Sequence, residues 1–339
     1  MILDLQQIKS VTTGAVRISQ ENDGIHFYRF TKEQEDMYLP RNQSFYDATF
    51  STPGIRLRFQ TNSSFVELKF SVDYAGPRSY FGVDISVDGV IFDAANNYSS
   101  VAEKDNYVDL KYSWGTFSKR WDIGTQEKEI QIYLPWSVNF VLQELVLEDG
   151  ATLTPVRPEK KALCFGDSIT HGADALRPSS RYISRFCDYL GAEEHCKAIC
   201  GEFFWPQLAN TKESFKPDYI TVAYGTNDWS KRSSAELEQN CFGFFRNLAE
   251  NYPDSKLIVI TPLWRADEEE KDREIPLSRV HEMIREAVKD HPNATVICGN
   301  GLVPHDPAYF GDFRLHPNDA GFDCYFKNLK NDFEKGIML

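Results

Sequence analysis

The apolar residues of this chain change their periodicity near residue 150, and this change constrains the fold more than any other feature. Before it, apolar and polar residues alternate in five clear runs: 55–59, 65–72, 83–87, 129–134 and 140–147. A period of two is typical of strands with one buried face. No amphipathic helix pattern interrupts these runs, and Asp88-Gly89 is a strong hairpin signal. We therefore predict an antiparallel, jelly-roll-like β-sandwich.

After residue 160, short apolar runs alternate with helical patterns. The predicted strands are 162–165, 197–200, 219–224, 257–261 and 295–298. The predicted helices are 182–190, 234–251, 277–290 and 318–334, the second of which starts with the capping box Ser233-Ser234-Ala235-Glu236. Such alternation is typical of an α/β domain, in which helices cover both faces of a parallel sheet.

The length of 339 residues favours two domains. We predict an accessory sandwich domain over residues 1–150, a linker rich in proline and charge over 151–160, and an α/β domain over 161–339. An edge of the sandwich could mediate a homodimer.

The composition argues against several classes of partner and cofactor. A net charge of −13 disfavours nucleic acid and anionic lipid, and no stretch approaches the roughly 20 apolar residues of a membrane span. All seven cysteines follow residue 160 with irregular spacing, as expected of reduced thiols. Cys196 and Cys200 lack the spacing of a zinc knuckle, so we expect no metal. With no secretory pattern at the N-terminus, these features predict a cytoplasmic protein.

Four short blocks in the second half carry residues suited to nucleophilic catalysis. Gly166-Asp167-Ser168 follows the strand at 162–165, Gly201 follows the next strand, Gly225-Thr226-Asn227-Asp228 follows the third, and His316-Pro317-Asn318-Asp319 precedes the last helix. The carboxyl ends of parallel strands share one edge of a sheet, so these side chains can meet in one pocket. A serine becomes a strong nucleophile when an imidazole accepts its proton.

In these blocks the chain resembles the SGNH (GDSL-type) hydrolases, and the resemblance extends from about residue 161 to 335. It implies a three-layer, flavodoxin-like fold with a parallel sheet and a carboxylic ester hydrolase activity that needs no cofactor. It also implies that Ser168 is the nucleophile and His316 the general base. The implied oxyanion hole consists of the N–H groups of Ser168 and Gly201 and the side-chain amide of Asn227.

The group that orients His316 is where the sequence departs from this family. The family usually has an aspartate three residues before the histidine, and here that residue is Phe313. Asp312 could reach the ring if the intervening loop bulges by one residue, and Asp319 is the other nearby carboxylate. Alternatively, a main-chain carbonyl orients the ring and the enzyme works with a Ser–His dyad. The sequence leaves this choice open.

A sandwich ahead of a GDSL-type domain is similar to the arrangement in carbohydrate esterase family 2. This resemblance implies removal of small acyl groups, acetyl above all, from a small-molecule or oligosaccharide ester. Trp229, Trp264 and Arg265 follow predicted strand ends and are candidates for substrate binding. The alternatives are a lysophospholipase or thioesterase, and a carbohydrate-binding protein with a degenerate hydrolase domain.

Overall fold

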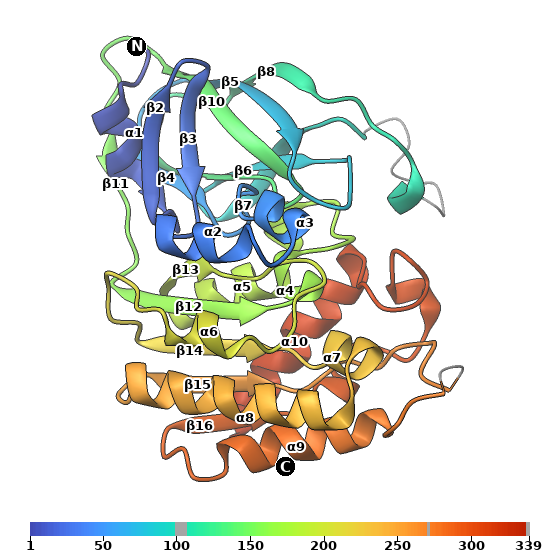
Figure 1. Cartoon of the computed structure of the whole chain (residues 1–339). Coiled ribbons are helices and arrows are strands. Elements are labelled where there is room, and N and C mark those ends of the chain that lie inside the picture. The colour runs from blue at the N-terminus through green and yellow to red at the C-terminus, as the bar shows by residue number, and fades with distance from the viewer. Residues whose placement is uncertain (99–106, 270–271, 337–339) are drawn as a thin grey trace. The chain divides into compact units, whose positions relative to one another are not determined.

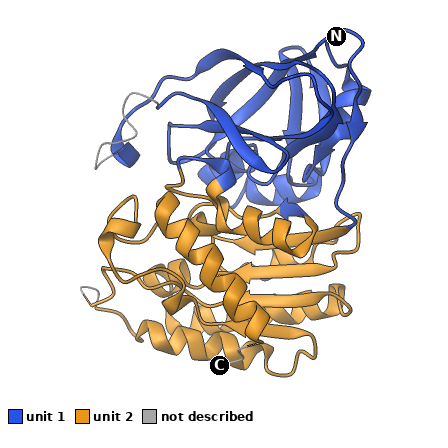
Figure 2. Ribbon diagram, turned by 180° about the vertical axis from the view of Figure 1, so that it is seen from behind, with its two compact units in different colours: residues 1–159, 176–179, 193–195 blue, residues 160–175, 180–192, 196–339 orange. Residues whose placement is uncertain are grey.

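The computed structural model describes residues 1–98, 107–269 and 272–336. It divides the chain into two compact units (Figure 2). Unit 1 contains residues 1–159, 176–179 and 193–195, and unit 2 contains residues 160–175, 180–192 and 196–339. None of the described helices combines the length and apolarity needed to cross a bilayer.

Unit 1 contains two antiparallel sheets, with the strand orders β1-β4-β9-β6-β7 and β2-β3-β10-β5-β8 (Figure 1). The strands of the first sheet are β1 Thr12–Thr13, β4 Arg56–Thr61, β6 Gly82–Val87, β7 Val90–Asn96 and β9 Lys128–Tyr133, and β11 Thr154–Pro155, within the predicted linker, pairs with β4. Those of the second are β2 Arg17–Glu21, β3 Gly24–Tyr28, β5 Phe65–Tyr74, β8 Gly115–Asp122 and β10 Val138–Leu147. The predicted β-sandwich is confirmed.

The hairpin predicted at Asp88-Gly89 is confirmed between β6 and β7. Asp88 has a φ of 49° and Gly89 a φ of 78°, so both turn residues are left-handed. This conformation is that of a tight turn whose twist matches the strands on either side.

As predicted, no described α-helix interrupts the five strand runs, but the sequence analysis missed three short helices that precede them. Unit 1 contains α1 Leu5–Val11, α2 Lys32–Tyr38, α3 Gln43–Ala48 and the 3-10 turn η1 Tyr107–Asp109. The three α-helices have at most seven residues each, too few turns for a helical period to stand out. Their signals are local instead: α1 and α2 begin with capping boxes, and the Asn42 side chain caps α3.

Unit 2 contains the parallel strands β12, β14, β15 and β16. The fifth strand of their sheet, β13, includes residues 193–195, which are grouped with unit 1, and the strand order is β13-β12-β14-β15-β16. The strands are β12 Lys160–Gly166, β13 Ala192–Cys196, β14 Tyr219–Ala223, β15 Lys256–Ile260 and β16 Ala294–Ile297. The helices are α4 Ser168–His171, α5 Tyr182–Leu190, α6 Pro206–Asn210, α7 Thr226–Lys231, α8 Ser234–Asn251, α9 Leu277–Val288 and α10 Asp319–Lys335. Short 3-10 turns are η2 Pro178–Ser180, η3 Gly299–Gly301 and η4 Pro307–Tyr309.

Helix α5 packs against α10, while α8 packs against α6 and α9, and these two groups complete the three layers of the predicted α/β fold (Figure 1). One predicted strand was misplaced: β13 covers Ala192–Cys196 instead of 197–200. Glu193 and His195 of this strand are polar although they are buried, so the strand has no apolar pattern. The prediction therefore placed the strand at the more apolar residues that follow. The N–H groups of Lys197 and Ile199 still donate to carbonyls of β12.

Gly299 allows the turn after β16 to approach the end of β15. A Cβ at this position would lie 1.9 Å from the carbonyl oxygen of Thr261 and 2.6 Å from that of Pro262. We expect Gly299→Ala to lower the free energy of unfolding by about 1–3 kcal/mol, because both neighbours are backbone atoms. Urea denaturation measures this loss. Gly301→Ala is the matched control, since a Cβ there meets nothing within 4 Å, and equal effects of the two changes would contradict the explanation.

Candidate active site

Ser168 is the first residue of α4 and lies directly after the carboxyl end of β12. The carboxylate of Asp167 caps this short helix by accepting the N–H of Ile169 at 3.0 Å. The hydroxyl Oγ of Ser168 lies 2.8 Å from Nε2 of His316, so the serine can donate its proton to the ring. The strand end and its cap therefore fix the hydroxyl at hydrogen-bonding distance from a base.

The other ring nitrogen of His316 faces the carboxylate of Asp312, with Nδ1 and Oδ2 2.7 Å apart. The second oxygen of Asp312, Oδ1, accepts the backbone N–H groups of Arg314, Leu315 and His316 at 3.0, 2.8 and 3.0 Å. One oxygen thus organises the loop while the other orients the ring. Of the groups that the sequence left open, the structure brings the Asp312 carboxylate to Nδ1.

The extra residue between Asp312 and His316 is absorbed by a left-handed backbone at Phe313. This residue has a φ of 56°, and its side chain is 49% exposed. A non-glycine residue with a positive φ is uncommon, and it bends the chain within a short distance. The loop therefore brings a carboxylate that lies four residues before the histidine, instead of three, to the imidazole ring.

The environment keeps Asp312 ionised. Burial opposes ionisation, but the hydrogen bond and charge of His316 and the N–H groups of Leu315 and His316 together hold the pKa of Asp312 below its usual range. An anionic acceptor at Nδ1 fixes the proton on that nitrogen and leaves Nε2 free to accept the serine proton.

Gly201 lies in the loop that follows β13, and Asn227 is the second residue of α7, which follows β14. Gly201 has a φ of 85°, and the N–H of Cys200 before it donates to Nδ1 of the buried His171 at 3.1 Å. Nδ2 of Asn227 donates to the carbonyl of Glu202 at 3.0 Å, which uses one of its two N–H bonds. The sequence analysis assigned no functional role to His171, and in the structure this side chain holds the backbone beside Gly201.

The three candidate substrate-binding residues do not line one pocket. Trp229 is 3% exposed, and its indole N–H donates to the carbonyl of Ile275 at 2.9 Å. Arg265 is 2% exposed and forms two hydrogen bonds with the carboxylate of Asp267 and two with Thr226. Trp264 and Arg265 border a cavity of about 700 Å³, whereas Trp229 borders a separate one of about 90 Å³.

The larger cavity lies between the loop after β15, helix α9 and the turn after β16. Its walls include an aromatic face, since Trp264 stacks on His305 with ring centroids 5.0 Å apart and planes 10° from parallel. Acidic, basic and amide side chains complete it, among them Glu268, Arg285 and Asn300. An aromatic face with surrounding polar groups is suited to a polar, ring-shaped ligand.

An ion-pair chain connects this cavity with the loop that carries His316. The carboxylate of Asp267 bonds Arg265 on one side and Nη1 of Arg314 at 2.9 Å on the other. Nη2 of Arg314 in turn lies 3.7 Å from Oδ2 of Asp312. The wall of the cavity and the carboxylate beside the ring therefore belong to one polar network.

Asp174 was missed by the sequence analysis and lies beside the same histidine, with Oδ2 3.9 Å from Nδ1 of His316. The carboxylate and imidazole atoms of Asp174, Asp312 and His316 lie within 4.8 Å of one another, as in many metal sites. However, the 2.7 Å between Nδ1 and Asp312 is a hydrogen-bond length, and Nε2 faces Ser168. We interpret the group as a hydrogen-bonded cluster.

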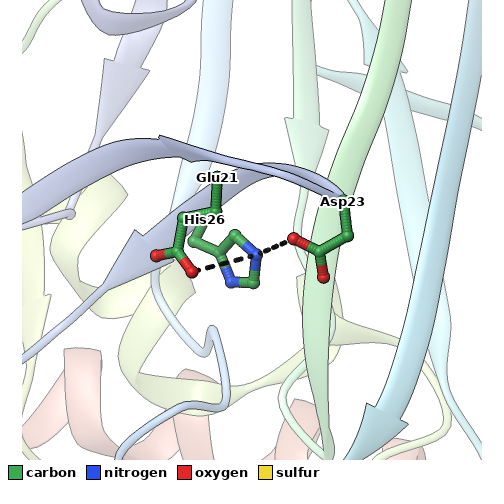
Figure 3. Close-up of side chains that lie close together, drawn as sticks. All are labelled: Glu21, Asp23 and His26. Atoms are coloured by element: carbon green, nitrogen blue, oxygen red, sulfur yellow. Dashed lines mark hydrogen bonds and ion pairs between the residues drawn. The ribbon is translucent and has the colours of Figure 1, made fainter.

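A second group of this kind, in unit 1, has a different geometry (Figure 3). Glu21 and Asp23 both face Nε2 of His26, at 3.9 and 2.8 Å. The two carboxylates are 45% and 62% exposed and lie in the β2–β3 hairpin. Because both acids compete for one ring nitrogen at an exposed position, we interpret this group as ion pairing within the hairpin.

Comparison with known proteins identifies the class of unit 2. Residues 164–324 match the model of the GDSL-like lipase/acylhydrolase family, and this match identifies a carboxylic ester hydrolase domain. The resemblance inferred from the sequence is confirmed. No curated protein matches the chain at a significant level.

Solved structures share the fold over nearly the whole chain. A putative GDSL-like lipase from Bacteroides ovatus is 22% identical, with a TM-score of 0.76 and coverage of 99% of this chain and 97% of that one. A salicylyl-acyltransferase from a tetracycline biosynthetic pathway is 17% identical, with a TM-score of 0.78 and coverage of 96% and 94%. A family two carbohydrate esterase from Cellvibrio japonicus is 14% identical, with a TM-score of 0.64 and coverage of 97% and 96%.

Beside the candidate oxyanion groups, Asp228 is a fully buried carboxylate whose two oxygens accept the N–H of Phe204 at 3.2 and 3.3 Å. The pKa of Asp228 is raised to about 7, mainly by burial and also by the charges of Glu202 and Asp167, while backbone N–H groups oppose the rise. The folded protein therefore holds a proton on Asp228 at pH values where the unfolded chain has lost it.

This raised pKa predicts a pH-dependent stability. The contribution of Asp228 is fully present below its unfolded pKa, near 4, and is lost as the pH rises through about 7. Asparagine cannot ionise, so the stability of Asp228→Asn relative to wild type should increase by about 2–4 kcal/mol between pH 4 and pH 8. Urea unfolding at both pH values measures this, with the exposed Asp290→Asn as the control. A pH-independent difference would contradict it.

Proposed function

We propose that this protein is a serine esterase that removes small acyl groups, acetyl above all, from a carbohydrate or a related hydroxyl-bearing substrate. The observation that carries the proposal is the continuous hydrogen-bonded chain from Ser168 through His316 to Asp312. The family match of residues 164–324 supports the reaction class, and the fold shared with carbohydrate esterases supports the substrate class.

In the acylation step, Oγ of Ser168 attacks the ester carbonyl carbon while its proton moves to Nε2 of His316. The carbonyl oxygen becomes an oxyanion, and the carbon–oxygen bond to the leaving alcohol then breaks. The alcohol oxygen takes the proton back from Nε2, which leaves an acyl ester on Ser168. Asp312 stays ionised throughout and stabilises the imidazolium that forms between the two proton transfers.

The deacylation step repeats this sequence with water as the nucleophile. Water gives a proton to Nε2 as its oxygen attacks the acyl carbon, and the bond to Ser168 Oγ then breaks. The proton returns from Nε2 to the serine, and the acid is released. The N–H groups of Ser168 and Gly201 and the amide of Asn227 are the proposed donors to the oxyanion, and one such donor is worth about 3–4 kcal/mol.

The cavity bordered by Trp264 and Arg265 is the proposed site of the alcohol part of the substrate. The stacked rings of Trp264 and His305 give it a flat apolar face of the kind that packs against sugar rings. Arg265 is already bonded to Asp267 and Thr226, so its part is to hold this wall in place. All seven cysteines are free thiols, which supports the proposal of a cytoplasmic location. We also propose that the protein forms a homodimer through an edge of the sandwich.

The first test is the loss of the nucleophile. Ser168→Ala should lower kcat for hydrolysis of 4-nitrophenyl acetate by roughly 10³-fold or more, because the remaining groups cannot form the acyl-enzyme. Wild-type turnover no faster than buffer would refute the esterase and favour a carbohydrate-binding protein with a degenerate hydrolase domain.

The same assay separates the proposed substrate from its alternatives. Activity should fall from acetate to octanoate, and acetylated mono- and oligosaccharides should release acetate. A preference for octanoate would favour the lysophospholipase or thioesterase alternative. Transfer of the acyl group to an added alcohol in preference to water would favour an acyltransferase, the activity named for one structure of the same fold.

The role of Asp312 predicts a second kinetic effect. Asp312→Asn should lower kcat by roughly 10²–10⁴-fold, because an amide favours the wrong ring tautomer and does not stabilise the imidazolium. Asp306→Asn is the matched control, as this exposed aspartate lies in the same loop and caps the short turn η4. A loss below about tenfold would instead favour a Ser–His dyad.

A further inference from the structure

A second carboxylate faces the imidazole of His316 from the loop that follows the nucleophile helix. Asp174 is fully buried, and its Oδ2 lies 3.9 Å from the ring nitrogen Nδ1. Asp174 lies outside the four blocks that the sequence analysis singled out, beyond the Gly-Asp-Ser turn and well before His316 in the chain.

The backbone that carries Asp174 is fixed to the nucleophile itself. The N–H groups of Gly172 and Ala173 both donate to the carbonyl of Ser168, at 3.0 and 2.8 Å. Gly172 and Asp174 have φ values of 115° and 70°, so two left-handed residues bend the loop back toward α4. Non-glycine residues in this conformation concentrate at functional sites, where the surrounding structure holds them in place.

We propose that Asp174 is a positioning residue that acts through His316. Its carboxylate, together with that of Asp312, stabilises the imidazolium that forms when His316 takes the proton from Ser168. The proposal rests on the function proposed above, and it adds a second anion to the group that supports the base.

The arrangement favours the charged state of the ring more than the neutral one. While the imidazole is neutral, the two carboxylates beside it repel each other. When the proton arrives at Nε2, the ring gains a positive charge and both carboxylates attract it. An interaction that strengthens as the reaction proceeds lowers the barrier, whereas one of constant strength does not.

Other charged and polar groups of the described residues also lie near the ring. Asp312 and the hydroxyl of Ser168 face the two ring nitrogens. Burial raises the pKa of the nearby Asp167 to about 6, and the charge of His316 opposes this rise. The cation Arg314 lies 3.7 Å from Asp312 but is 45% exposed, so solvent and salt weaken its opposing effect. Asp174 is shielded from solvent, which keeps its interaction with the ring strong.

The test is the titration of His316 in Asp174→Asn, a change that keeps the size of the side chain and tolerates a left-handed backbone. In protein labelled with ¹⁵N-histidine, the midpoint of the His316 titration followed by NMR should fall by about one pH unit, because an attracting charge is removed. The acid limb of kcat/KM for 4-nitrophenyl acetate should move to lower pH by the same amount, and the plateau should fall roughly tenfold.

Asp88→Asn is the matched control, because Asp88 is also a left-handed aspartate but lies in the β6–β7 turn of unit 1. It should leave both midpoints unchanged. If Asp174→Asn does not fold, Asp174→Gly removes the carboxylate and keeps the backbone conformation. An unchanged midpoint in the folded variant would overturn the proposal even if turnover fell. Absence of wild-type esterase activity would instead refute the proposed function, while the NMR midpoint would still decide whether Asp174 acts on the ring.

Discussion

The carboxylate of Asp312 is the interaction on which the rest of the site depends. One oxygen accepts three consecutive backbone N–H groups, and the other faces Nδ1 of His316 at 2.7 Å. The same side chain thus shapes the loop and orients the ring. A carboxylate that holds its own loop cannot move away from the histidine without breaking several hydrogen bonds at once, so the imidazole is held at hydrogen-bonding distance from Ser168 before any substrate binds.

The sequence predicted the parts of the fold that depend on long, repeated patterns. Period-two alternation predicted the sandwich, and the alternation of strands and helices predicted the three-layer domain. Helices α5 and α8 begin and end at the predicted residues. What it missed depends on a few residues each. The three short helices of unit 1 are specified by caps such as Asp4 and Thr31, and β13 is a strand with buried polar residues that no apolar period reveals.

The residues of the candidate site also fall into two groups, those that short sequence motifs predict and those that depend on single backbone torsions. Ser168, Gly201 and Asn227 were singled out because they stand in short blocks next to strand ends, where position in the chain nearly fixes position in space. His316 was singled out because its block stands just before the last helix. The choice between Asp312 and a main-chain carbonyl depended on one backbone torsion, the left-handed φ at Phe313. Asp174 could not be predicted because its position depends on two left-handed residues, only one of which is a glycine.

The same reasoning explains why the reaction class was easier to predict from the sequence than the identity of the substrate. The candidate reacting groups lie on short segments held by local hydrogen bonds, such as those of Asp167 and Asp312, whereas the cavity with Trp264 and His305 is built from loops that follow β15 and β16. Residues as far apart in sequence as Arg265 and Asn300 meet there, and no local motif encodes their meeting. Ion pairs connect Arg265 to Asp267, Asp267 to Arg314, and Arg314 to Asp312. A substitution in the cavity wall can therefore also change the position of His316, which Asp312 orients. Changes in specificity and in turnover are therefore expected to be coupled in this protein.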